Sequence, residues 1–458
     1  MASDSNMATG PTALAPSRAA MMQIVWRLAW PVILTMSVES LVGLVDMLMV
    51  GRLGARPVAG VGVATQILFA VNTVMFAVGT GTIAVVARHY GAREPEQCGR
   101  ILGQSILLVT VLMTLVAIPV FVWAPAIISL FRVEAEVVAI GVDYLRVVLL
   151  AVPADGILVI IGFALRGAGD MRTPLAVGVV VAVVNVVANY VLIFGKLGFP
   201  ALGATGAAWG TALAFATGAV LLFWAVRRGG LTLTLPPGWM RPQPAVIRRI
   251  VAIGYPSAIE HILMQVGFVI YFSFAAAYDT AAVAAYVIGG RILGLSFLPG
   301  IGFSVAASAL VGQNLGARKP EQARRSGWGA TGLSVVLMSI GGLLIFLGAR
   351  PIAALFVDDA RVVAEAVVFI QVLAAAQPLM ALDFTLGGAL RGAGDTRFPL
   401  LTVLIGFYVC RLGFAYCVTY VFELSLFWLW FALVPDYVAR VVLKVARFRS
   451  NRWQEIRV

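Results

Sequence analysis

Long apolar runs alternate with short polar segments along almost the whole chain. The runs are about twenty residues or longer, which is enough for an α-helix to cross the hydrocarbon core of a bilayer. They predict twelve membrane helices, with approximate limits 24–50, 58–87, 101–124, 137–164, 174–195, 204–226, 247–277, 281–311, 327–349, 362–390, 399–421 and 425–446. The pattern therefore predicts an all-α integral membrane protein that crosses the membrane many times.

Basic residues are distributed unevenly between the two sets of loops. If both termini are cytoplasmic, 24 of the 33 lysines and arginines fall in inner segments and 6 in outer loops, with Arg146, Arg291 and Arg411 inside spans. An excess of Lys and Arg marks the cytoplasmic side of membrane proteins. We therefore expect both termini to be cytoplasmic.

The composition narrows the possible partners. The chain has 458 residues, of which 61% are hydrophobic and 12% charged, and its net charge is +12. The basic residues lie in short loops between apolar runs, so they indicate contact with membrane lipids and not with nucleic acid. Two histidines and three cysteines show no metal-ligand spacing, and no G-x-S-x-G or Walker A motif occurs. We expect no cofactor and no enzymatic activity.

The chain contains an internal repeat. LRGAGD occurs at 165–170 and again at 390–395, and at the same spacing of 225 residues GAREPEQ at 91–97 aligns with GARKPEQ at 316–322. Each half then holds six helices in the same orientation, as in transporters built from parallel repeats, whose substrate site lies between the halves. A channel or receptor fits two such halves less well.

The repeat divides the chain into five segments. We expect a cytoplasmic tail at 1–23, an N-terminal lobe at 24–226, a cytoplasmic linker at 227–246, a C-terminal lobe at 247–446 and a basic tail at 447–458.

The LRGAGD copies have a structural interpretation. Their glycines can end one helix in the left-handed conformation, and Asp170 and Asp395 can cap the next helix. Arg166 and Arg391 are expected among lipid phosphates.

Several longer motifs carry a family resemblance. VDMLMVGRLGA at 45–55, LVGQNLGA at 310–317, the LRGAGD copies and NVVANYVLIFGKLGFPALGATGAAWGTA at 185–212 resemble the multidrug and toxic compound extrusion family, of the bacterial NorM/DinF type. The resemblance covers essentially the whole chain. It implies a multi-pass transporter of the bacterial inner membrane that acts on small molecules and needs no obligatory protein partner.

Residues that break the repeat are candidates for function. Asp46 aligns with Tyr271, so this acid belongs to one half only, and Asn185 and Asn189 lie four residues apart on one helix face. An acid and two amides could bind sodium, or the acid could bind a proton. The resemblance implies that these three residues form the cation site of the N-terminal lobe. The alternative is a hydrogen-bonded polar cluster that only joins spans 1 and 5.

Four further residues are candidates for the substrate cavity. Glu39 lies two helical turns before Asp46, either as a second carboxylate of the same cavity or as a protonated acid packed in mid-span. Glu260, Asp383 and Tyr271 belong to the second half. The resemblance implies acids about one turn from Glu260 and Asp383, which leaves a second ion site open.

Two of the other intramembrane acids have a simpler explanation than a functional site. Asp143 with Arg146, and Asp436 with Arg440, have the spacing of ion pairs within one helix.

Eight acids against three arginines within the spans favour organic cations as substrates. We therefore expect a secondary antiporter that exports amphipathic cations in exchange for sodium or protons. A flippase for lipid-linked oligosaccharides is the alternative.

Overall fold

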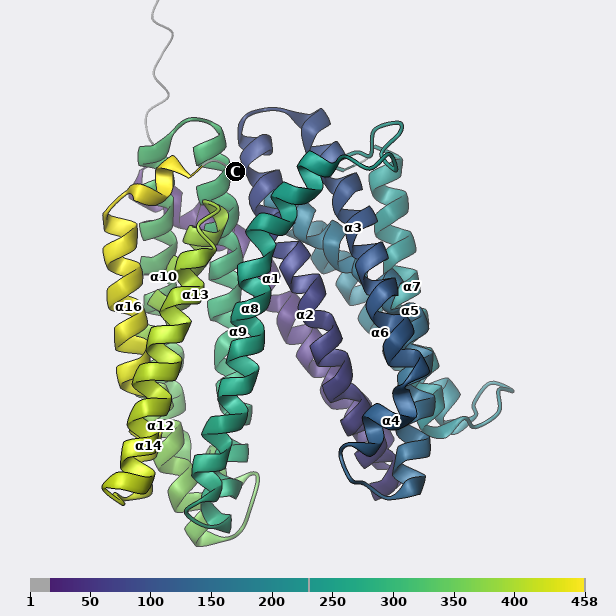
Figure 1. Ribbon diagram of the computed structural model, residues 1–458, viewed down its shortest axis with the longest axis vertical. Helices are drawn as coiled ribbons and strands as arrows, with labels where there is room; N and C mark the ends of the chain where they lie inside the picture. Colours follow the sequence, from purple (N-terminus) through teal and green to yellow (C-terminus); the bar gives the residue numbers. More distant parts are fainter. Residues whose placement is uncertain (1–16, 230, 457–458) are drawn as a thin grey trace, which may run out of the picture.

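The structure is a computed structural model that describes residues 17–229 and 231–456, and the described chain is almost entirely helical (Figure 1). Its elements are α1 (Arg18–Gly51), α2 (Ala55–Gly91), α3 (Pro95–Val122), α4 (Ala124–Ser129), α5 (Ala135–Gly167), α6 (Arg172–Phe194), α7 (Gly203–Arg227), α8 (Pro244–Ala276), α9 (Thr280–Gly316), α10 (Pro320–Leu347), α11 (Ala349–Ala354), α12 (Ala360–Gly392), α13 (Arg397–Val403), η1 (Leu404–Leu412), α14 (Gly413–Tyr416), η2 (Cys417–Val421), α15 (Leu426–Phe431), α16 (Leu433–Arg449) and η3 (Arg452–Glu455). Twelve segments of the described chain are long and apolar enough to span a membrane, which confirms the predicted number.

The two halves match helix by helix. The pairs α2 and α9, α3 and α10, α4 and α11, and α5 and α12 have equal lengths, and the spacing of 225 residues superimposes their bounds. The repeat found in the sequence is thus a repeat of structure, with two lobes of six membrane helices each.

Two membrane helices extend into the segments predicted as tails, and the linker is held against α3. Helix α1 begins at Arg18, inside the predicted N-terminal tail, and α16 continues to Arg449, inside the predicted C-terminal tail. The linker between α7 and α8 is docked on α3, because the Gln104 amide donates to the carbonyls of Trp239 and Arg241 at 2.9 and 3.0 Å. Residues 1–16 of the predicted tail, and 457–458, lie outside the described residues.

One membrane segment departs from the regular helix that its sequence predicts. The eleventh span is divided into α13, η1, α14 and η2, and both η segments are π-helical. Its counterpart α6 in the first lobe is one continuous α-helix. A π-helix accommodates extra residues within a helix and often occurs at functional sites. This departure coincides with the cluster of buried charges described below.

The LRGAGD turns are only partly as predicted. Gly169 and Gly394 have φ values of 87° and 90°, which confirms the left-handed glycine in each turn. Asp170 accepts hydrogen bonds from the backbone N–H groups of Arg172 and Thr173 at 3.1 and 3.0 Å, as a cap should. The predicted cap is wrong for Asp395, because its carboxylate instead accepts from Arg447 at 2.8 Å.

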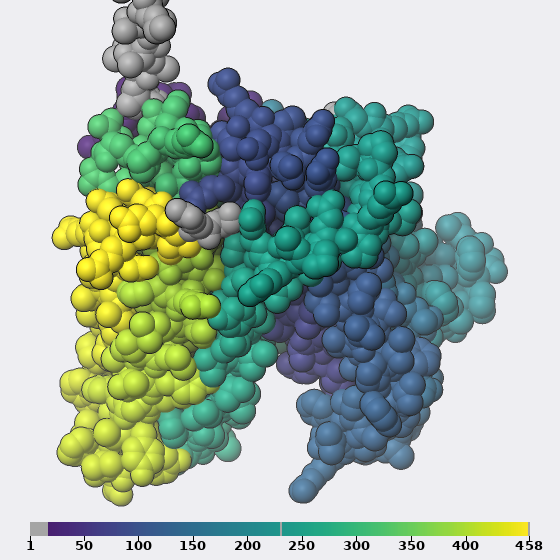
Figure 2. Space-filling model, turned by 45° about the horizontal axis from the view of Figure 1, so that its top comes forward, coloured from purple at the N-terminus to yellow at the C-terminus, as the bar shows by residue number. Residues whose placement is uncertain are grey.

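The two lobes converge at one end of the molecule and separate at the other (Figures 1 and 2). We call the first the closed end; the start of α1, the linker and the described C-terminus lie there. The space-filling view shows a cleft between the lobes at the opposite, open end. The first helix of each lobe packs against the other lobe. Helix α1 contacts α9 and α10, and helix α8 contacts α2, which also packs against α9.

Two glycines bring the lobes together at the closed end. A Cβ on Gly91 would lie 1.9 Å from the carbonyl oxygen of Gln313, and a Cβ on Gly316 would lie 1.8 Å from that of Arg88. These four residues form two pairs of repeat mates, so the contact is reciprocal. Backbone approaches backbone here, which only glycine permits.

We expect Gly91→Ala and Gly316→Ala each to weaken the closed end. The new methyl group has to displace backbone, and overpacking of this kind typically costs about 1–3 kcal/mol. The melting temperature in detergent should therefore fall by several degrees. Gly43→Ala is the matched control in a membrane helix, because nothing lies within 4 Å of its Cβ position. Equal melting temperatures for all three variants would contradict this account of the contact.

Candidate ion and substrate sites

The structure brings together the three residues predicted to bind an ion. Asp46 comes from α1, and Asn185 and Asn189 come from successive turns of α6. The Asn189 amide donates to the Asp46 carboxylate at 2.7 Å and to the Asn185 carbonyl oxygen at 3.1 Å. When the Asn185 amide is turned so that its nitrogen faces Asp46, it donates to both carboxylate oxygens, at 2.9 and 3.1 Å. Asp46 thus has neutral partners in this cluster.

One buried oxygen in this cluster accepts no hydrogen bond in the described chain. The side-chain oxygen of Asn189 is buried and has no hydrogen-bond partner in the described chain. It points at Gly210 of α7, where a Cβ would lie only 1.9 Å away. A buried amide oxygen without a donor is costly, and such groups in a native structure call for an explanation. A hard cation or an acidic proton would supply what this oxygen lacks.

Thr211 is a member of the cluster that the sequence analysis did not single out. While the Asn185 oxygen faces Asp46, the Asn185 nitrogen donates to this hydroxyl at 3.3 Å, and the hydroxyl donates to the carbonyl of Ala207 at 3.0 Å. It lies within the quoted motif at 185–212, directly after Gly210, and this position was the available signal. Carboxylate, amide and hydroxyl oxygens together form a set that suits sodium. Groups of three or more His, Cys, Asp or Glu residues that could hold a metal do not occur in the described residues.

Glu39 lies nearer the start of α1, and its side chain is exposed. Its electrostatic neighbours are Arg166 and Asp155, both on α5. The expectation that Arg166 lies among lipid phosphates is wrong, because this side chain turns into the lobe. Its Nε is buried without a hydrogen-bond partner in the described chain, and its guanidinium lies 5.7 Å from the centre of the Phe163 ring.

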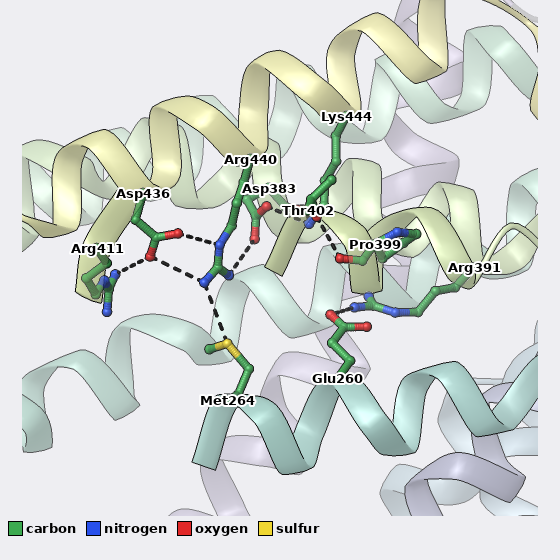
Figure 3. Close-up of polar contacts among 10 residues, drawn as sticks. All are labelled: Glu260, Met264, Asp383, Arg391, Pro399, Thr402, Arg411, Asp436, Arg440 and Lys444. Atoms are coloured by element: carbon green, nitrogen blue, oxygen red, sulfur yellow. Dashed lines mark hydrogen bonds and ion pairs between the residues drawn. The ribbon is translucent and has the colours of Figure 1, made fainter. Parts of the chain in front are cut away.

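The candidate acids of the C-terminal lobe are held by basic residues (Figure 3). Glu260 of α8 pairs with Arg391 at 2.5 Å, which replaces the predicted contact of Arg391 with lipid phosphates. Asp383 of α12 pairs with Lys444 at 2.5 Å, and Arg440 lies 3.8 Å away. Both candidate acids are therefore engaged with bases of their own lobe.

A third acid completes the same cluster. Asp436 forms an ion pair with Arg440 at 2.6 Å, which confirms the predicted pair within one helix, and another with Arg411 at 2.8 Å. The cluster thus contains three acids and four bases. Most of its members are at most 5% exposed, namely Asp383, Arg411, Asp436, Arg440 and Lys444. Removal of one partner of such a buried pair leaves an uncompensated charge.

Tyr271 is also buried and engaged. Its ring is 2% exposed, and its hydroxyl donates to the carbonyl of Leu429 at 2.5 Å. It lies in the packed core of the C-terminal lobe, among other aromatic rings such as Tyr286 at 5.9 Å.

The sequence analysis did not find Lys444 as a partner for Asp383. The available signal was its spacing, because Asp436, Arg440 and Lys444 recur every four residues on one face of α16. The other predicted pair within a helix is replaced: Arg146 donates instead to the carbonyl of Phe121 at 3.3 Å.

We expect Lys444→Met to destabilise the protein strongly. It leaves the Asp383 carboxylate buried without its nearest base, and loss of one partner of a buried pair costs about 3–5 kcal/mol. The double variant Asp383→Leu with Lys444→Met should recover part of the lost melting temperature. Arg361→Gln is the control, because its pair with Asp279 is exposed and should contribute little. If the double variant is less stable than Lys444→Met alone, the buried pair does not explain the loss of stability.

Comparisons with known proteins agree with this architecture. The MatE family model matches the chain twice, at residues 31–191 and 256–417. A probable multidrug resistance protein NorM from Thermotoga maritima is 28% identical over 433 residues, covering 94% of this chain and 92% of that protein. The multidrug resistance protein PmpM from Pseudomonas aeruginosa is 27% identical over 398 residues, covering 85% and 82%.

The fold is also that of a solved transporter. The outward-facing conformation of a multidrug resistance MATE family transporter superimposes with a TM-score of 0.86 at 22% identity, covering 94% of this chain and 97% of that one. The two matches of the family model fall in order on the two structural repeats and together span most of the chain. The chain therefore belongs to the MATE family of multi-pass membrane transporters.

Proposed function

We propose that this transporter is an antiporter that exports amphipathic, mainly cationic compounds and is driven by sodium ions or protons that bind at Asp46. The observation that carries the proposal is the difference in charge compensation between the lobes. Asp46 is bonded to neutral amides, whereas Glu260, Asp383 and Asp436 are bonded to arginine or lysine. An acid without a compensating base can exchange a cation at the lowest cost.

The amides of this site suit either coupling ion. Both can donate to the Asp46 carboxylate, so a sodium ion would require Asn185 and Asn189 to turn their oxygens toward it. A proton would make Asp46 a donor, and the unused Asn189 oxygen could accept from it once the amide turned that oxygen from Gly210 toward Asp46. In both cases ion binding changes the hydrogen bonds that join α1 to α6.

The substrate would enter the cleft between the two lobes, predicted at 24–226 and 247–446. The closed end carries most of the basic segments and is expected to face the cytoplasm of a bacterium, with the protein in the inner membrane. The cleft would then open outward, and the lobes would rock to expose it inward. The exposed carboxylate of Glu39 is the candidate for contact with the substrate's charge. To contact a substrate, Glu260 and Asp383 would have to release their basic partners, and Tyr271 would have to move out of the packed core of the C-terminal lobe.

A flippase for lipid-linked oligosaccharides is the second candidate. The observation in its favour is the excess of bases over acids in the C-terminal cluster, because a pyrophosphate cargo is anionic. Most of these bases are buried and paired, and only Arg391 is partly exposed, with 23% of its side chain accessible. The antiporter is therefore the better supported function.

We expect Asp46→Asn to abolish ion-driven efflux while the protein stays folded. Asparagine keeps the shape of the side chain but cannot carry the charge or exchange a proton. Asn185→Ala and Asn189→Ala should reduce coupling less, because each removes one neutral ligand. The measurement is transport of a fluorescent organic cation in proteoliposomes, first under an imposed sodium gradient and then under an imposed proton gradient.

Asp143→Asn is the matched control, because this acid lies on α5 with an exposed side chain and outside the cluster. It should transport at the wild-type rate, and size exclusion in detergent should show intact protein for every variant. Wild-type rates for Asp46→Asn under both gradients would remove Asp46 from the mechanism. Transport of anionic lipid-linked sugars alone would replace the antiporter with the flippase.

A further inference from the structure

Two grooves at the closed end are equivalent by the repeat, and one of them is filled. The filled groove lies between α3 and the start of α8, where the linker packs on α3. A Cβ on Gly99 would lie 2.2 Å from the carbonyl oxygen of Thr234, and a Cβ on Gly103 would lie 2.8 Å from the side chain of Trp239. The small residues of α3 therefore make room for the chain's own linker.

Within the described residues, the equivalent groove between α10 and the start of α1 is open. It encloses about 590 Å³, and its walls carry Arg18, Arg324, Arg325 and Trp328.

The residues that line the open groove differ in kind from those of the filled one. Arg324 and Trp328 stand where α3 has Gly99 and Gly103, and Arg18 stands where the linker has Gln243. Glu321 pairs with Arg324 at 2.8 Å and with Arg325 at 3.6 Å, so one acid faces three arginines. The groove is thus open and carries a net positive charge.

The same groove is apolar further along α10. Leu333 and Val336 line it there, and Val336 is 56% exposed. Gly332 leaves open space beside them, because nothing lies within 4 Å of its Cβ position. Trp328 stands between the basic and apolar parts and packs edge-on against Phe448, with 5.4 Å between the ring centres. A basic end and an apolar end that opens sideways fit a molecule with a charged head and an acyl chain.

We propose that this groove binds an anionic phospholipid of the leaflet at the closed end. Its phosphate lies among Arg18, Arg324 and Arg325, and an acyl chain lies along Leu333 and Val336. Basic pockets between membrane helices bind anionic headgroups in this way. Because Arg18 begins α1 of the first lobe and the other two arginines belong to α10 of the second, the lipid joins the two lobes.

The test measures lipid retention on the purified full-length protein by native mass spectrometry. The protein is loaded with equal amounts of phosphatidylglycerol and phosphatidylcholine, and the bound fraction of each is compared. We expect wild-type protein to retain phosphatidylglycerol about tenfold better, because each arginine near a lipid phosphate adds to the attraction. The triple variant Arg18→Gln, Arg324→Gln and Arg325→Gln should lose this preference.

Two further variants separate lipid binding from folding and from general charge. Gly332→Leu keeps every charge but fills the apolar part of the groove, and it should also release the lipid. The control triple Arg100→Gln, Arg248→Gln and Arg249→Gln removes as much charge from α3 and α8, which form the filled groove, and it should retain the lipid.

Three outcomes would overturn the proposal. Equal retention of the two lipids by wild-type protein would show no anionic site, and equal loss in the control triple would show only general charge attraction. Retention that appears only after deletion of residues 1–16 would assign the groove to that segment instead, since its equivalent in the repeat is the linker.

Discussion

A carboxylate in the hydrocarbon region of a membrane costs about 2.5–3.5 kcal/mol even on the gentler scale, so each one needs a partner. The two lobes meet this requirement differently. In the C-terminal lobe, Asp383 and Asp436 are bonded to lysine and arginine and are almost completely buried. In the N-terminal lobe, Asp46 is bonded to amides that carry no charge. The same scaffold thus holds a charge-compensated cluster in one lobe and, in the other, an acid whose hydrogen-bond partners are neutral.

The compensated cluster lies beside an irregular helix. A Cβ on Gly406 would lie 2.5 Å from the Arg440 side chain and 2.6 Å from the Asp436 carboxylate, so the π-helical segment η1 must pass close to both. The repeat mate of Gly406 is Val181, which lies in the regular helix α6. Local backbone geometry and buried charge therefore changed together in one lobe.

The sequence predicted the architecture well because membrane helices and repeats leave strong periodic signals. The length of each apolar run and the spacing of 225 residues were enough for twelve helices in two lobes. The same spacing identified Asp46, Asn185 and Asn189 as residues of one lobe, and the structure places them in contact. What failed depended on contacts between distant segments. No local pattern shows that Arg391 reaches Glu260, that Lys444 reaches Asp383, or that the eleventh span contains π-helix.

The reciprocal contact of Gly91 and Gly316 has a consequence for reversibility. Gly91 faces the Gln313 carbonyl and Gly316 the Arg88 carbonyl, and because glycine has no side-chain rotamers, neither glycine loses side-chain entropy when the contact forms. The two glycines can therefore part from the facing backbone and return without any change of rotamer of their own, and the Gln313 amide, which donates to the Gly167 carbonyl at 2.8 Å, is a side-chain bond across the lobes that has to break.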